Sequence, residues 1–252
     1  MGIINCTPDS FHTASQHGDF QSALQMITEG ADWIDVGGES TRPGADFVPL
    51  QQEMERVVPV IAAIRDSSEV WISVDTRRLE VAQAALQAGA DMVNDVSGLR
   101  DQGMFSIVLD SGCAVCIVHM QGEPGTMQDQ PCYENVFEQV YSSLLATARR
   151  LVEAGHPREL IVLDPGIGFG KTLEHTLALL HAVERGNEDF SILWGCSRKS
   201  FIGSLTSRPD SHDRLAGTLA TAAQAQRIGI DILRVHDIAA HLDLAKVLSA
   251  LE

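Results

Sequence analysis

Short apolar runs alternate with longer amphipathic segments along the whole sequence, and this pattern limits the folds that it can adopt. The apolar runs lack polar alternation and are too short for helices, which is typical of parallel strands covered on both faces. We therefore predict eight strands, at Gly2–Asn5, Trp33–Val36, Trp71–Val74, Met92–Asn94, Ala114–Val118, Leu160–Leu163, Ser191–Trp194 and Ile232–Val235.

The segments between these runs carry apolar residues at the spacing of one helix face. Several of them end at a glycine that is followed two residues later by aspartate, as at Gly30, Gly89 and Gly229. Glycine in this position is a common helix C-cap. We predict helices over Ser22–Glu29, Glu53–Arg65, Leu79–Ala88, Met104–Asp110, Asn135–Ala154, Leu173–Ala182, Asp213–Ile228 and Ile238–Leu251.

The chain has 252 residues, with no Pro- or Ser-rich linker and no block of different composition. Eight β-α units in one undivided domain of this size predict an α/β fold, a single (β/α)8 TIM barrel over residues 1–252. An open doubly wound sheet is the alternative. Because aromatic residues make up only 5 %, the core must be aliphatic, and we expect Trp33, Trp71 and Trp194 to belong to it.

Charge and cysteine content exclude several classes of partner. The 34 acidic residues against 18 Lys and Arg give a formal charge of −16, which disfavours nucleic acid and anionic membranes as partners. No apolar run reaches the roughly 18 residues of a membrane span, and the first residues do not resemble a secretion signal. Five scattered cysteines argue against a disulfide framework and for a cytoplasmic location.

Polar residues stand at the predicted carboxyl end of every strand, where barrel enzymes place their chemistry. Such residues could cap strands as they reach water, but their presence after all eight runs favours a shared site. They are Asn5, Asp35, Asp75, Asn94, His119, Asp164, the Ser197–Ser200 segment and the Arg234–Asp237 segment.

These side chains fall into two chemical groups. Asp75, Asn94 and Asp164 offer carboxylates and an amide, which suit a flat heterocycle with several N–H donors and carbonyl acceptors. A second group suits an anion with several oxygens, and comprises Arg42, Lys199, Arg234 and His236. Asn5 could supply an oxygen to Mg²⁺. Together the groups suggest a substrate that joins a ring to a phosphate or diphosphate.

A glycine-rich stretch over Pro165–Thr172 resembles a nucleotide-binding P-loop but fails the spacing test. A P-loop needs four residues between its first glycine and the Gly-Lys pair, and counting back from Gly170 reaches Pro165. The glycines more plausibly allow a sharp turn or a close approach of the backbone to a ligand.

Several motifs in order resemble the dihydropteroate synthase family, nearly from end to end. They are GIINCTPDSF at 2–11, GGESTRPG at 37–44, SVDT at 73–76, NDVSG at 94–98, His119-Met120, DPGIGFGKT at 164–172, SRKSFIG at 197–203 and RVHD at 234–237. The resemblance implies a (β/α)8 barrel that joins 6-hydroxymethyl-7,8-dihydropterin diphosphate to 4-aminobenzoate, giving dihydropteroate and diphosphate for folate synthesis.

The resemblance also implies roles for individual residues. The pterin diphosphate contacts would be Thr41, Asp75, Asn94, Val96, Met120, Asp164, Lys199, Arg234, Val235 and His236. The 4-aminobenzoate side, where sulfonamides compete, would be Arg42, Pro43, Phe169, Lys199 and Ser200. Asn5 would be the Mg²⁺ ligand, and Asp75, Asp164, Lys199, Arg234 and His236 would be catalytic.

The implied mechanism is a dissociative substitution. Mg²⁺, Arg234 and His236 would stabilise the departing diphosphate, while Asp75 and Asp164 would stabilise the pterin cation. Two alternatives stay open: a catalytically weak or inactive pterin-binding paralogue, and a pterin-dependent methyltransferase. The family also forms homodimers, and the last helix carries an apolar face at Ile238, Leu242, Ala245, Leu248 and Leu251.

Two departures from the family pattern stand out. Where the family has Ser-Asp-Gly-Gly after Asp-Ser-Phe, this chain has His12-Thr13-Ala14-Ser15, so Thr13 replaces an aspartate associated with loop closure. This change bears on turnover more than on substrate binding. The family also carries a short segment ahead of the first strand, so we expect either a less covered barrel floor or a trimmed chain.

Overall fold

A computed structural model describes residues 1–6, 13–39, 47–123, 125–182 and 189–251. The described residues form a sheet of eight parallel strands in sequence order. A bridge between Gly2 and Val235 closes the sheet, with the Ile3 N–H donating to the Val235 carbonyl at 3.0 Å. The strands are β1 (Gly2–Asn5), β2 (Trp33–Gly37), β3 (Trp71–Asp75), β4 (Met92–Asp95), β5 (Ala114–Val118), β6 (Ile161–Asp164), β7 (Ser191–Trp194) and β8 (Ile232–Leu233).

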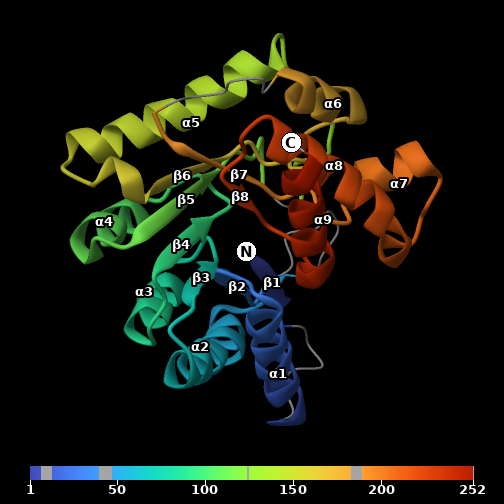
Figure 1. Ribbon diagram of the computed structural model, residues 1–252. Helices are drawn as coiled ribbons and strands as arrows, with labels where there is room; N and C mark the ends of the chain where they lie inside the picture. Colours follow the sequence, from blue (N-terminus) through green and yellow to red (C-terminus); the bar gives the residue numbers. More distant parts are fainter. Residues whose placement is uncertain (7–12, 40–46, 124, 183–188, 252) are drawn as a thin grey trace.

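Helices surround this sheet, as Figure 1 shows, and the fold is the predicted TIM barrel. Most of them match the predicted segments, whereas the seven-residue α7 was not predicted because it is too short to show a helical period. The helices are α1 (Thr13–Glu29), α2 (Leu50–Ser67), α3 (Leu79–Gln87), α4 (Gln102–Ser111), α5 (Val136–Glu153), α6 (Leu173–Ala182), α7 (Ser200–Thr206), α8 (Leu215–Arg227) and α9 (Ile238–Leu251), with short 3₁₀ turns η2 (Arg158–Leu160) and η3 (Ser211–Arg214).

Two apolar clusters hold the fold together. The larger one joins strand residues such as Ile34 and Ile72 to helix residues such as Ile61 and Leu144. The smaller one contains alternate strand residues, including Met92, Cys116, Val118, Val162 and Leu193. Because side chains alternate along a strand, these two sets lie outside and inside the barrel respectively.

The inward side of the barrel changes character toward the carboxyl ends of the strands. Asp75 and Asp164 are the last residues of β3 and β6, and Asn94 lies one residue before the end of β4. All three are buried and belong to the strands themselves. The barrel therefore places the predicted polar residues on its most rigid element.

The amino ends of the strands carry two tryptophans. Trp33 and Trp71 stack with ring centroids 5.4 Å apart and line a hollow of about 550 Å³. Trp194 is buried, as expected, but Trp71 is 56 % exposed, so its assignment to the core was wrong. Trp71 begins its strand, and the first residue of a strand lies at the rim of the barrel.

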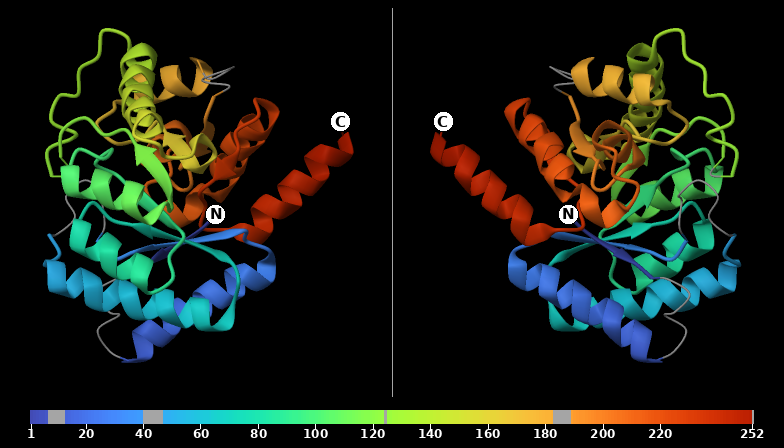
Figure 2. Two further views of the ribbon diagram at one scale, coloured as in Figure 1. Left: turned by 90° about the vertical axis from the view of Figure 1, so that its left-hand side faces the viewer. Right: turned by 90° about the vertical axis from the view of Figure 1, so that its right-hand side faces the viewer.

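The carboxyl-terminal part of helix α9 projects away from the barrel, as the two views of Figure 2 show. Its buried residues are Ile238 and His241, both near its start, whereas Val247 and Leu251 are 58 % and 78 % exposed. All five cysteines are free thiols. Among the described residues, the helices are too short or too polar to cross a membrane.

Candidate active site at the carboxyl end of the barrel

A cavity of about 210 Å³ opens among the loops that follow the strands. Its lining combines acidic, cationic and aromatic side chains from six of the β-α units. Seven residues to which the sequence assigned a binding, metal or catalytic role line it, namely Asn5, Asp75, Phe169, Lys199, Ser200, Arg234 and His236.

Arg234 lies between two carboxylates at the base of this cavity. Its Nε donates to Asp35 Oδ2 at 2.5 Å, and its Nη2 donates to Asp75 Oδ2 at 2.6 Å. The Asp35 side chain is fully buried. The sequence marked Asp35 as a polar residue at the end of its strand but gave it no binding or catalytic role, although a carboxylate inside the apolar run Trp33–Val36 was a signal for one. The guanidinium is thus held in place by two charge-assisted contacts.

Asn94 extends the same group of polar side chains. Its Nδ2 lies 3.4 Å from both carboxylate oxygens of Asp35, while its Oδ1 is buried with no hydrogen-bond partner among the described residues. A buried acceptor without a partner is costly unless a ligand or water supplies a donor. The barrel interior beside Asp35 therefore suits a group that carries N–H donors.

Burial shifts the acidity of the carboxylates here. It raises the pKa of Asp75 to about 7, although the adjacent Arg234 opposes the shift. Burial likewise raises the pKa of Asp164, whose Oδ1 accepts the Gly166 N–H at 2.7 Å. These carboxylates would gain most from a ligand that donates hydrogen bonds to their ionised form.

Lys199 and Phe169 form another part of the cavity wall. The Lys199 ammonium lies 3.9 Å from the centroid of the Phe169 ring, a cation–π contact. Burial, assisted by the nearby Arg234 charge, lowers the pKa of Lys199 to about 8. Ser200 follows at the start of α7 and lines the same cavity. A cation beside an aromatic ring suits a ligand that has an aromatic ring and an acidic group.

The loops after β7 and β8 are joined at the cavity rim. Ser197 Oγ lies 2.9 Å from His236 Nδ1 and accepts the His236 backbone N–H at 3.3 Å. Arg198 donates to both carboxylate oxygens of Asp237, at 3.1 and 2.5 Å. This bidentate pair fixes the two loops to each other and so positions Ser197 and His236.

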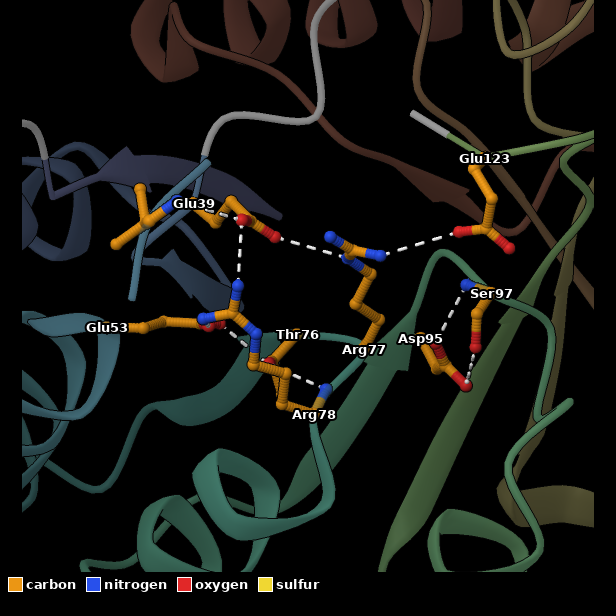
Figure 3. A network of polar contacts seen from close by, with 9 residues as sticks. Glu39, Glu53, Thr76, Arg77, Arg78, Asp95, Ser97 and Glu123 are labelled. Atoms are coloured by element: carbon orange, nitrogen blue, oxygen red, sulfur yellow. Dashed lines mark hydrogen bonds and ion pairs between the residues drawn. The ribbon is translucent and has the colours of Figure 1, made fainter. Parts of the chain in front are cut away.

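A second ionic network joins the loops that follow β2 and β3, as Figure 3 shows. Glu39 accepts from Arg78 Nη2 at 2.9 Å and from Arg77 Nε at 3.2 Å. Arg78 Nη1 also donates to Glu53 at 2.6 Å. Glu39 lines the cavity, so this network connects α2 and the β3–α3 loop to the site. Sequence reasoning assigned Glu39 no role.

Five of the predicted contact residues lie in the barrel without lining the cavity, namely Asn94, Val96, Met120, Asp164 and Val235. Val96 and Met120 are buried, and Val235 is buried with its backbone closing the barrel against β1. Their contacts with a ligand stay predictions. Thr41, Arg42 and Pro43 lie outside the described residues, as do His12 and the side chains of Thr13, Ala14 and Ser15.

The donor set for a metal ion is sparse. The part of the chain that the structure describes contains no group of three or more His, Cys, Asp or Glu side chains placed to hold a metal ion. Asn5 does line the cavity. One amide oxygen beside an anion site fits Mg²⁺, which keeps several waters and is often bound largely through substrate phosphates.

Comparison with known proteins gives one consistent result. Residues 1–236 match the family described as pterin binding enzyme. The dihydropteroate synthase of Escherichia coli strain K12 is 43 % identical over 99 % of this chain and 90 % of its own length.

Solved structures of dihydropteroate synthases are also similar to this chain. A Yersinia pestis dihydropteroate synthase with a sulfonamide drug complex has a TM-score of 0.92 and 38 % identity, covering 100 % of this chain and 93 % of its own. The Burkholderia cenocepacia enzyme complexed with 7,8-dihydropteroate has a TM-score of 0.91 and 42 % identity, covering 100 % and 90 %. The chain belongs to the dihydropteroate synthase family of pterin binding enzymes.

Proposed function

We propose that this protein is a transferase that condenses 6-hydroxymethyl-7,8-dihydropterin diphosphate with 4-aminobenzoate to give 7,8-dihydropteroate and diphosphate. The proposal rests on one cavity that has a charged carboxylate–arginine group at one part and a lysine–phenylalanine pair at another. The Asp75–Arg234–Asp35 group forms its base, and the Lys199–Phe169 pair forms its side. The bound dihydropteroate in the Burkholderia cenocepacia relative supports the same product.

The pterin ring would bind at the base of the cavity. Its N–H groups would donate to Asp75 and Asp164, and an N–H would also satisfy the unpartnered Asn94 Oδ1. Arg234 holds Asp75 from the opposite side, so the carboxylate is oriented before the ring arrives. The diphosphate would lie nearer the rim, toward His236 and Thr41.

The 4-aminobenzoate would bind beside Phe169, with its carboxylate near Lys199, Ser200 and Arg42. Lys199 supplies a positive charge at this wall, and Phe169 supplies an aromatic face. A sulfonamide drug is present in the Yersinia pestis relative. We expect sulfonamides to compete with 4-aminobenzoate for this wall.

Catalysis would be mainly electrostatic. Loss of diphosphate leaves positive charge on the pterin methylene, and the ionised carboxylates of Asp75 and Asp164 would stabilise that charge. His236 and Arg234 would stabilise the departing negative charge. The amine of 4-aminobenzoate then attacks the methylene and loses a proton, with no covalent bond to the protein.

We further propose that Mg²⁺ binds with the diphosphate and that Asn5 is its protein ligand. The support is chemical: Asn5 offers a hard oxygen and lines the same cavity as His236. Mg²⁺ would supply charge neutralisation for the leaving group.

A diphosphate-release assay tests the function and the metal together. With both substrates and Mg²⁺, diphosphate should appear only when 4-aminobenzoate is present, and EDTA should abolish its release. Asn5→Ala should raise the Mg²⁺ concentration required for half-maximal rate. Release that does not depend on 4-aminobenzoate would contradict the proposed reaction, and release unaffected by EDTA would contradict the metal.

Two further properties are proposed on separate grounds. A homodimer through α9 would cover the exposed apolar side chains of Val247 and Leu251. A cytoplasmic location fits five free thiols, because a reducing compartment keeps cysteines in that form.

A further inference from the structure

Three consecutive carbonyls in the loop after β6 each accept a hydrogen bond from a different side chain. Gln128 Nε2 donates to the Gly168 carbonyl at 2.7 Å, and Lys171 Nζ donates to the Phe169 carbonyl at 3.0 Å. Tyr133 Oη donates to the Gly170 carbonyl at 2.8 Å. Ordinary loops leave such carbonyls to water, so this arrangement holds the backbone of the loop at three successive points.

The Lys171 ammonium, which donates to the Phe169 carbonyl, also contacts two acceptors of His119. Its Nζ also lies 3.0 Å from His119 Nδ1 and 3.4 Å from the His119 carbonyl. An ammonium group has three N–H donors, and these three acceptors match them. Lys171 is buried, so the contacts are made away from competing water. The loop after β6 is thereby connected to the end of β5.

Tyr133 and Gln128 come from the connection between β5 and α5, and that connection is itself fixed. Gln121 bonds to Cys132 through both groups of its side-chain amide: its Nε2 donates to the Cys132 carbonyl at 3.1 Å, and its Oε1 accepts the Cys132 N–H at 3.2 Å. The Tyr133 ring also lies edge-on against His175, with centroids 5.0 Å apart. The Tyr133 hydroxyl is therefore a fixed point.

The loop needs such support because its own backbone is permissive. Gly166, Gly168 and Gly170 all have positive φ, of 66°, 82° and 60°. Glycine makes these conformations accessible but does not select them over others. Phe169 lies between two of these glycines, and its ring faces the Lys199 ammonium across the cavity wall. The position of that ring thus depends on what binds the carbonyls around it.

We propose that Gln128, Tyr133 and Lys171 form a carbonyl clamp, a set of positioning residues that places the Phe169 ring for the aromatic amine substrate. The proposal rests on the proposed function, because it assigns the clamp to the 4-aminobenzoate side of the same reaction. None of the three clamp residues lines the cavity described above. They act through Phe169 and touch no reacting atom.

The chain offers a matched pair of tyrosines for the test. Tyr133→Phe removes a hydroxyl that bonds the Gly170 carbonyl, whereas Tyr141→Phe removes a buried hydroxyl with no hydrogen-bond partner among the described residues. Loss of one hydrogen bond predicts a rise of about fivefold in the KM for 4-aminobenzoate for Tyr133→Phe. The KM for the pterin diphosphate should stay within about twofold of wild type. Tyr141→Phe should change neither.

A second variant separates positioning from general damage. Gln128→Leu keeps much of the bulk of an exposed side chain but removes its amide donor, and it should raise the same KM. The double variant Gln128→Leu/Tyr133→Phe should raise it about tenfold or more, since the loop would lose two of its three supports. The melting temperature should stay near that of wild type in each variant.

The outcomes distinguish this inference from the proposed function. An inactive wild-type chain would overturn the function, and the clamp with it. With an active wild type, an unchanged KM for 4-aminobenzoate in the double variant would overturn the clamp alone. Equal increases in both KM values, or the same effect in Tyr141→Phe, would also overturn it, because they indicate general disturbance of the fold.

Discussion

The contact of Arg234 with Asp35 and Asp75 is the most informative feature at the scale of single residues. Sequence reasoning placed a cation at the end of β8 to bind diphosphate, and the structure places it against two carboxylates instead. Arg234 thus balances the charge of Asp35 and Asp75, beside which we propose that the pterin ring binds. Any charge it supplies to diphosphate is shared with Asp35 and Asp75.

Asp75→Asn tests the charge on the ring side of the cavity. The variant should lower kcat at least about tenfold with saturating Mg²⁺ and substrates, because the pterin cation loses a stabilising negative charge. An unchanged kcat would remove Asp75 from the mechanism.

The pH dependence of the same residue follows from its raised pKa of about 7. As pH falls below that value Asp75 becomes protonated, so kcat/KM for the pterin diphosphate should fall with it. Asp75→Asn carries no titrating carboxyl here and should show no such decrease. If kcat/KM of Asp75→Asn still falls at low pH, the titration of another group, such as Asp164, causes the fall.

The pKa of Lys199 predicts a loss of 4-aminobenzoate binding at high pH, in contrast to the effect of Asp75 at low pH. The Lys199 pKa is lowered to about 8, so above that pH Lys199 loses the charge that attracts the 4-aminobenzoate carboxylate. The KM for 4-aminobenzoate should therefore rise as pH increases through 8. Lys199→Arg keeps its charge at these pH values and should flatten the rise. A rise that persists in Lys199→Arg would point to Lys171, whose pKa burial lowers to about 7.

At the scale of elements, the strands were predictable and the loops were not. Each buried strand shows itself as an apolar run, and its last polar residue marks the carboxyl end, as Asp75 and Asp164 do. Helix α7 left no periodic signal because it has only seven residues, and the carbonyl clamp left none because its contacts join residues far apart in sequence. Lys171 and Tyr133 are 38 residues apart, and both donate to carbonyls of the loop after β6.

The glycine at the start of that loop allows a direct test of close backbone approach. A Cβ at Gly166, which has a φ of 66°, would lie 1.8 Å from the His119 carbonyl oxygen. Gly166→Ala should therefore lower the melting temperature by about 5 °C or more.

Gly112 at the end of α4 is the matched control for this prediction. Its φ of 65° is nearly the same, but a Cβ there would meet nothing within 4 Å. Gly112→Ala should cost only the backbone strain, about 1 kcal/mol. Equal losses in the two variants would show that the contact with His119 contributes nothing.

At the scale of the whole molecule, the acidic surface and the cationic site are separate. The net charge of −16 excluded nucleic acid as a favoured partner, yet Lys199, Arg234 and His236 gather around one cavity. Surface charges are screened over about 10 Å, so these cations act on a ligand at the cavity despite the acidic net charge. The net charge could not predict that these cations meet at one cavity, whereas the polar residues at the strand ends did.

The exposed apolar residues of helix α9 predict that the chain forms a homodimer. If this helix forms the dimer interface, Val247→Glu should convert dimer to monomer in light scattering, because it places a charge within an apolar contact. Leu205→Glu on α7 alters a similarly exposed apolar residue, at 56 % exposure, and should leave the dimer intact. A wild-type monomer would contradict the proposed dimer.

We propose that both substrates react in one cavity. Mass spectrometry of a reaction with both substrates and Mg²⁺ tests this proposal by following dihydropteroate and diphosphate together. The two products should appear in equal amounts, and neither should appear without 4-aminobenzoate. Diphosphate without dihydropteroate, or bound pterin with no turnover, would contradict it.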